Sequence, residues 1–114
     1  MSYSQDQLKK LAENDVTKLI KILNNPSSDT YTLTMGAEIL GEEISDEAIS
    51  VPIFKKLLKH INAVVREGAI IGIMALFSDK RLPEDILNMV RDIFNNDPSP
   101  ALKEYAEDIL KDYQ

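Results

Sequence analysis

The chain of 114 residues contains no cysteine and only one histidine. Without cysteine there is no disulfide framework, no thiol nucleophile and no thiolate metal site. The sole histidine, His60, has no nucleophile or second ligand near it in the sequence, and a metal site needs several converging ligands. We therefore expect no enzyme, no catalytic residues, no metal and no cofactor, and we interpret His60 as a cation at a helix end.

Long apolar runs are also missing. The longest, Gly68 to Phe77, has ten residues, whereas a membrane-spanning helix needs about 18. The N-terminal stretch MSYSQDQLKK lacks the basic and apolar regions of a secretory signal peptide. With 44% hydrophobic and 28% charged residues, the composition is that of an ordinary globular protein. We expect a cytoplasmic protein with no membrane partner, and a single domain over residues 1–114.

Strand signals are absent as well, because no segment alternates with period two and no Asn-Gly or Asp-Gly hairpin turn occurs. Helical patterns run along the whole chain instead, which predicts an all-α protein. The first helix follows a capping box at Ser4, and the pattern breaks near Asn14-Asp15. Pro52 should kink its helix or mark the first turn of that helix. The predicted helices cover about 5–23 with that break, 29–43, 45–60, 62–78, 83–95 and 99–112.

An internal repeat organises these helices. The segments LTMGAEIL (33–40), VREGAIIG (65–72) and LKEYAEDI (102–109) align on Ala37, Ala69 and Ala106. Ala69 follows Ala37 by 32 positions, and Ala106 follows Ala69 by 37. Each aligned helix comes after a shorter helix that ends in a polar turn. The repeat therefore predicts three helical hairpins, at approximately 15–43, 46–78 and 83–113.

The middle copy, SVPIFKKLLKHINAVVREGAIIGI, resembles the HEAT-repeat family. Pro52 matches the proline of the family's first helix, and Val65-Arg66 followed by Ala69 matches the signature of its second helix. The third copy follows the pattern with lysine in place of arginine, whereas the first copy has Thr34 there and fits least well. The resemblance implies a right-handed α-solenoid of three HEAT-like hairpins with an N-terminal helix. Repeats shorter than the roughly 40 residues usual for the family require tight hairpin loops.

The solenoid interpretation explains two glycines inside the helix of the middle copy. A second helix in a middle repeat is enclosed on three sides, so it carries no simple amphipathic stripe. Small side chains at Gly68, Ala69 and Gly72 would let neighbouring backbones approach closely. That packing offsets the loss of helix propensity, which is about 1 kcal/mol per glycine.

Charge is distributed unevenly around a net value of −6. Residues 29–50 hold six acids and no base, while residues 51–66 hold four bases and no acid, so the molecule should be electrically lopsided. The basic stripe Lys55, Lys56 and Lys59 lacks interleaved aromatic residues, and we interpret it as the outer face of its helix. Binding to phosphate backbones is disfavoured because it needs a clustered positive surface.

In each predicted hairpin, the residues of the second helix can be placed around its axis at about 100° per residue, and this placement yields a candidate site. With Val65, Ala69 and Gly72 turned inward, the opposite sides of the three helices would form the concave face of the solenoid. An apolar centre bordered by carboxylates is typical of a site for a basic amphipathic protein segment. The candidate partner-binding residues are Met35, Glu38, Glu42, Glu67, Ile70, Met74, Glu104 and Glu107.

Two alternatives to this site remain open. Ile70 and Met74 could pack under a terminus or a neighbouring repeat instead of facing a partner. Glu38 and Glu42, which share a helix face, could hold a hard cation or act in acid/base chemistry, although a solvated helix face is the simpler explanation.

The functional hypothesis is a non-enzymatic protein-binding module. One alternative is an acidic inhibitor or immunity-type protein that neutralises a basic toxin or enzyme. A second, less favoured, alternative is an accessory protein that handles nucleic acid or a cofactor. An apolar end of a three-repeat stack could also be covered by self-association.

Overall fold

Seven α-helices make up the fold of residues 2–113, which are the residues that the computed structural model describes, and no strand occurs among them. The all-α prediction is confirmed. The helices are α1 (Gln5–Asn14), α2 (Val16–Leu23), α3 (Thr30–Glu43), α4 (Glu47–Leu57), α5 (Ala63–Leu76), α6 (Glu84–Asn96) and α7 (Pro100–Leu110), and a short 3-10 helix η1 (Lys111–Tyr113) follows.

Most helices begin where a side chain accepts a hydrogen bond from a free backbone amide. The predicted capping box is present at Ser4, whose hydroxyl accepts from the Gln7 amide while the Gln7 side chain accepts from the Ser4 amide. Asp15 separates α1 from α2, since its amide donates to the Leu11 carbonyl and its carboxylate accepts from the Lys18 amide. The predicted break at this position is therefore confirmed.

Pro52 does not mark a first turn. It lies inside α4, which begins at Glu47 after the N-cap Asp46. Proline has no amide hydrogen, so the carbonyl of Ala48 has no intrahelical donor at this point. Both residues are exposed, and water can therefore satisfy that carbonyl.

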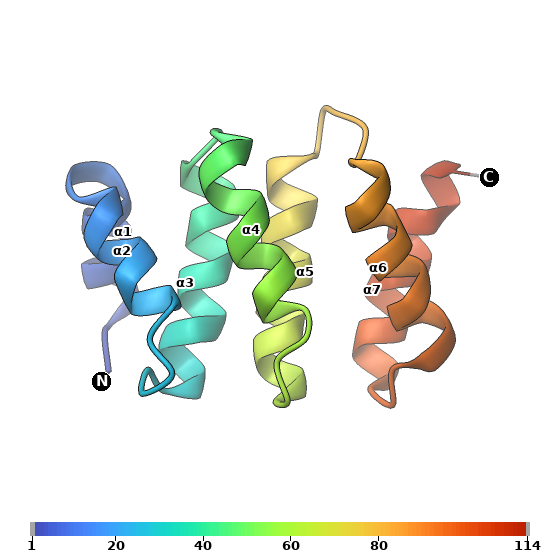
Figure 1. Cartoon of the computed structure of the whole chain (residues 1–114), viewed down its shortest axis with the longest axis horizontal. Coiled ribbons are helices and arrows are strands. Elements are labelled where there is room, and N and C mark those ends of the chain that lie inside the picture. Colours follow the sequence, from blue (N-terminus) through green and yellow to red (C-terminus); the bar gives the residue numbers. More distant parts are fainter. Residues whose placement is uncertain (1, 114) are drawn as a thin grey trace.

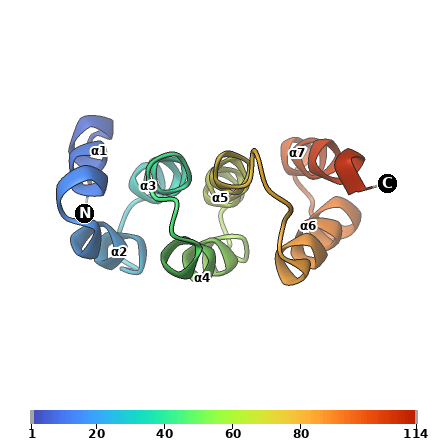
Figure 2. The same ribbon diagram turned by 90° about the horizontal axis from the view of Figure 1, so that it is seen from above.

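The helices form two layers (Figures 1 and 2). One layer contains α1, α3, α5 and α7 in chain order, and the other contains α2, α4 and α6. The core lies between the layers and includes the fully buried side chains of Leu8, Leu40, Phe54, Ile73 and Leu102. The two ends of the chain lie at opposite ends of the row (Figure 1). Helices α1, α3, α5 and α7 pack against their neighbours in the row, whereas α2, α4 and α6 pack mainly against the facing layer.

The contact between α3 and α5 is the most extensive between any two helices of residues 2–113. Glycines make it possible. A Cβ atom at Gly41 would collide with the backbone of Gly72, and one at Gly68 would lie 2.6 Å from the carbonyl oxygen of Thr34. A Cβ at Gly72 would meet the Phe54 ring at 2.6 Å. The predicted close approach of backbones at Gly68 and Gly72 is confirmed.

The middle helix α5 contacts α3, α4 and α7. Its inward side chains are those expected from the repeat alignment, because Val65, Ala69, Gly72 and Leu76 are all buried. Enclosure on three sides explains why this helix carries an apolar run in place of a simple amphipathic pattern.

Polar contacts between distant parts of the chain join residues that lie 29 to 33 positions apart in the sequence. The Arg66 guanidinium forms a two-pronged ion pair with Asp97, with nitrogen–oxygen distances of 2.9 and 3.1 Å across 31 positions. Asn62 donates to the Thr30 hydroxyl and Lys56 to the Asn24 carbonyl, each across 32 positions. Lys80 pairs with Glu47 across 33 positions. Consecutive helical pairs are therefore joined at equivalent places along the row.

Candidate protein-binding surface

One side of α5 is open to solvent. Its exposed or partly exposed residues recur at helical spacing: Val64, Glu67, Ile71 and Met74. Val64 and Met74 are 49% and 37% exposed, and together with the partly exposed Ile71 they make this stripe mainly apolar. Glu67 is the single charged residue of this stripe.

The placement of Ile70 on this surface is wrong. Its side chain is fully buried, and Phe77, on the same predicted face, is only 7% exposed. Helices α3 and α7 contact α5 to unequal extents, so they cover its two flanks unequally. The exposed stripe is therefore rotated around the axis of α5, relative to the predicted stripe, by about half of the 100° that separates successive residues. Ile71 occupies the position that was assigned to Ile70.

The neighbouring stripe on α3 continues this surface with Tyr31, Met35, Glu38 and Glu42. Tyr31 is 50% exposed, whereas Met35 and Glu38 are partly buried. Burial raises the pKa of Glu38 above its ordinary value of 4.5, and the negative charge of Glu42 raises it further. No lysine or arginine occurs in α3, so the carboxylates have no base on their own helix to offset them.

The two candidate residues of α7, Glu104 and Glu107, line different hollows. Glu104 is exposed and lines a shallow hollow with Asp108. Glu107 lines a different hollow with Arg91 and Phe94 of α6, so it faces the other helix of its own pair. Asp108 aligns with Ile71 in the repeat and, unlike Glu107, lines a pocket together with Met74.

We call the surface formed by these stripes the acidic face. Sequence phasing missed four of its members: Tyr31, Val64, Ile71 and Asp108. Buried and exposed positions alternate along each helix, and this alternation identifies the four residues. It depends on which neighbouring helices cover each side, and the sequence pattern alone does not show that. The acidic face consists of Tyr31, Met35, Glu38, Glu42, Val64, Glu67, Ile71, Met74, Glu104 and Asp108.

The lysines of the predicted basic stripe lie on or just after α4, in the other layer. Lys55 pairs with Asp85, and the Lys56 ammonium group lies 3.3 Å from two oxygens of Asn24. The contact between Lys55 and Asp85 lowers the pKa of Asp85, chiefly through the hydrogen bond that Lys55 donates. Lys59 is exposed near the end of α4. The charge separation expected from the sequence therefore lies between α3, which carries three acids and no base, and the last turn of α4, which carries lysines.

His60 has a local structural role in the turn between α4 and α5. Its Nδ1 atom accepts a hydrogen bond from the Asn62 amide at 3.0 Å, and its carbonyl accepts one from Arg66 at 2.8 Å. These contacts give His60 a place in the structure of the turn, and its expected role as a cation at a helix end stays a prediction. Within residues 2–113, no group of three or more His, Cys, Asp or Glu side chains is arranged to hold a metal ion.

Comparison with known proteins found no matching family model, no similar curated protein and no similar solved structure. Over the described part of the chain, no helix has the length and apolar character needed to cross a membrane.

Proposed function

We propose that the chain is an α-solenoid of three HEAT-like hairpins, formed by α2 and α3, α4 and α5, and α6 and α7, with α1 covering the first. The recurrent polar contacts across 29 to 33 residues support this interpretation. So does the row of α1, α3, α5 and α7 in chain order (Figure 2). Nearest-neighbour stacking of this kind is the defining property of repeat proteins.

The function that the geometry supports best is non-enzymatic binding of a protein partner on the acidic face. The observation that carries this proposal is the exposed apolar stripe of α5, which has carboxylates on both sides. Val64, Ile71 and Met74 supply apolar area, while Glu38, Glu42 and Glu104 border it. Such a surface complements a segment that has apolar side chains on one face and lysine or arginine around them.

An acidic inhibitor or immunity-type protein is a specific form of this function. The three carboxylates of α3, which has no base of its own, favour it, because a concentrated negative surface accelerates association with a basic partner. Its affinity would fall steeply with ionic strength. Nucleic-acid binding has less support, since Lys55 and Lys56 are already engaged with Asp85 and Asn24.

Affinity capture from lysate of the source cells tests the proposal. We expect the double variant Glu67→Arg/Met74→Arg to lose the partner that the unaltered chain retains, because it reverses charge and removes apolar area at the centre of the acidic face. Both positions are solvent-accessible, so the variant should keep the helical circular-dichroism spectrum of the parent.

The matched control reverses two charges on the opposite layer, Lys56→Glu/Lys59→Glu. This variant should retain the partner. Loss of the partner in the control but not in the acidic-face variant would place the interaction on the predicted basic stripe and would refute the proposal.

A further inference from the structure

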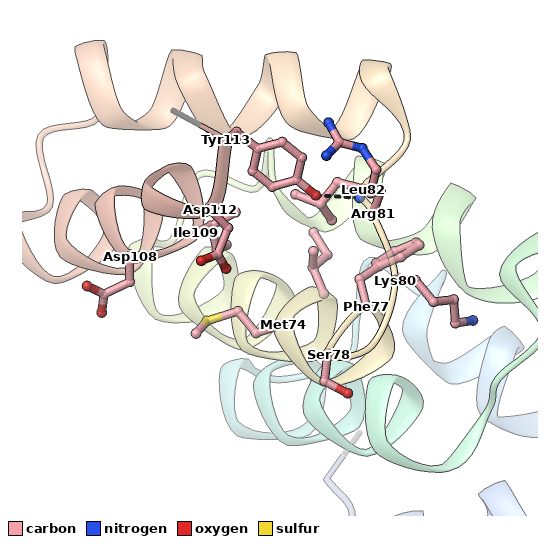
Figure 3. A pocket seen from close by; sticks show the side chains of 11 residues that line it. Met74, Phe77, Ser78, Lys80, Arg81, Leu82, Asp108, Ile109, Asp112 and Tyr113 are labelled. Carbon is pink, nitrogen blue, oxygen red and sulfur yellow. Dashed lines mark hydrogen bonds between the residues drawn. The ribbon is translucent and has the colours of Figure 1, made fainter.

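A pocket of about 270 Å³ opens at one end of the acidic face, between the end of α5, the segment that leads into α6, and α7 with η1 (Figure 3). Its apolar walls come from both sides of this junction. Met74 and Phe77 lie on one side, and Ile109 and Tyr113 on the other, with Leu82 between them. Because Met74 belongs to both, the pocket is continuous with the acidic face.

The pocket is held open by a contact between its walls. The Leu82 amide donates a hydrogen bond to the Tyr113 hydroxyl at 2.6 Å across 31 positions, which Figure 3 shows as a dashed line. This bond ties η1 to the segment between α5 and α6. A concave site that exists before binding avoids part of the ordering cost of association.

The two positively charged side chains that line the pocket, Lys80 and Arg81, contact other groups of the protein. The Arg81 guanidinium lies 4.8 Å from the centre of the Tyr113 ring. Lys80 pairs with Glu47 at 3.3 Å and lies 5.8 Å from the centre of the Phe77 ring. These contacts leave both cations oriented toward groups of the protein itself.

Two carboxylates lie on the other rim. Asp112 and Asp108 are both exposed, and in Figure 3 the Asp112 carboxylate hangs toward Met74 while Asp108 lies farther out along α7. Lys111 approaches Asp108 at 3.5 Å. The pocket therefore combines apolar and aromatic side chains in its walls with a rim that carries charges of both signs, on which Asp112 is the carboxylate that has no ion pair within the described residues.

We propose that this pocket, which we call the anchor pocket, receives one large aromatic side chain of the protein partner, with a lysine or arginine beside it paired to Asp112. The inference rests on the proposed function and specifies its partner. The volume is below the roughly 300–1,000 Å³ of sites for small molecules, so it suits a single side chain. The Met74 sulfur and the aromatic rings of Phe77 and Tyr113 favour an aromatic occupant.

The methionine methyl groups provide a direct test by NMR. Met74 lines the anchor pocket, Met35 lies on the α3 part of the acidic face, and Met89 lies in a hollow of the other layer. Protein labelled with ¹³C at the methionine methyls is titrated with two capped dipeptides, acetyl-Phe-Arg-amide and acetyl-Phe-Glu-amide.

We expect acetyl-Phe-Arg-amide to shift the Met74 signal saturably and to leave the Met89 signal in place. It should bind about two- to fivefold more tightly than acetyl-Phe-Glu-amide, which is the range for an exposed ion pair. The variant Asp112→Asn should abolish this difference while leaving binding of the phenylalanine intact. Equal affinities for the two dipeptides, no shift of Met74, or an equal shift of Met89 would overturn the proposal.

A longer probe separates failure of the anchor pocket from failure of the proposed function. A 14-residue peptide of leucine and lysine at helical spacing should shift both Met35 and Met74. If this peptide shifts Met35 while neither dipeptide shifts Met74, the anchor pocket is refuted and the acidic face stands. If the peptide shifts neither signal, the proposed function itself is contradicted.

Discussion

Glu38 is the residue of the acidic face whose charge opposes folding. Its carboxylate is partly buried on α3, and both burial and the nearby Glu42 raise its pKa above 4.5. A raised pKa means that the folded chain binds the proton more tightly than the unfolded chain does. The stabilisation that comes from the protonated form is therefore complete below the unfolded pKa and is lost as the pH rises through the folded value.

Replacing Glu38 with glutamine should consequently stabilise the protein at neutral pH. We expect Glu38→Gln to raise the Tm at pH 7 by less than the roughly 4 °C that corresponds to 1 kcal/mol in a domain of this size, because the site is partly solvated. The difference from the parent should shrink as the pH falls toward 4. Thermal melts followed by circular dichroism at several pH values measure it.

Glu43→Gln is the control for this prediction, because Glu43 is exposed at the end of the same helix. It should leave the Tm nearly unchanged at every pH. A difference between Glu38→Gln and the parent that stays constant from pH 7 to pH 4 would show that the carboxylate charge is not its cause.

Residues on the solvent side of a helix were harder to predict than those on the core side. Val65, Ala69 and Leu76 are buried as the repeat pattern indicated, since apolar spacing reports the side with the largest buried area. Ile70 and Ile71 are chemically identical neighbours, and only the cover supplied by α3 and α7 decides which is open. That cover depends on contacts between hairpins, which a single sequence does not encode locally.

At the scale of elements, the glycines of α3 and α5 set the distance between two helices. The sequence predicted a close approach at Gly68 and Gly72 because glycine inside a helix loses stability unless packing compensates. The sequence did not identify the opposing residue, Gly41, because that requires the register of α3 against α5. In the structure a side chain at Gly41 has no room beside the Gly72 backbone.

Two identical substitutions in α3 test this spacing. Gly41→Ala should destabilise the protein by about 1–3 kcal/mol, since backbone atoms cannot move aside without separating the helices. Gly36→Ala is the matched control, because its Cβ would meet only the end of the Leu23 side chain, with the nearest atom at 2.6 Å. The nearest atom is a terminal methyl carbon and not backbone, so a small shift of the buried Leu23 side chain relieves the contact. The gain in helix propensity offsets that cost, and Gly36→Ala should change stability by about 1 kcal/mol or less in either direction. Urea unfolding measures both, and equal effects would contradict the role of Gly41.

At the scale of the whole molecule, the two junctions between hairpins are built differently. α3 and α5 meet backbone to backbone through glycines, whereas α5 and α7 contact each other less extensively and border the anchor pocket. A second hollow of about 440 Å³ lies at the same junction near His60 and Asp97. The ion pair between Arg66 and Asp97, whose side chains are 12% and 8% exposed, crosses this junction. In a stack with nearest-neighbour contacts, the weaker junction should open first.

Native-state hydrogen exchange should reveal this difference. We expect amides of α6 and α7 to exchange about tenfold faster than those of α3 and α5, which corresponds to an opening free energy lower by about 1.4 kcal/mol.

Arg66→Gln should accelerate exchange in α6 and α7 further while leaving α3 unchanged, because it removes a largely buried ion pair between the second and third hairpins. Arg91→Gln is the control, since the hydrogen bonds of Arg91 within residues 2–113 go to Glu84 and Asn88 of its own helix, α6. Fraying of the chain end would make α7 fast in every variant alike, so a response to Arg66→Gln confined to the third hairpin identifies the junction as the weak point. An equal acceleration of α3 would instead mean that the three hairpins unfold as one unit.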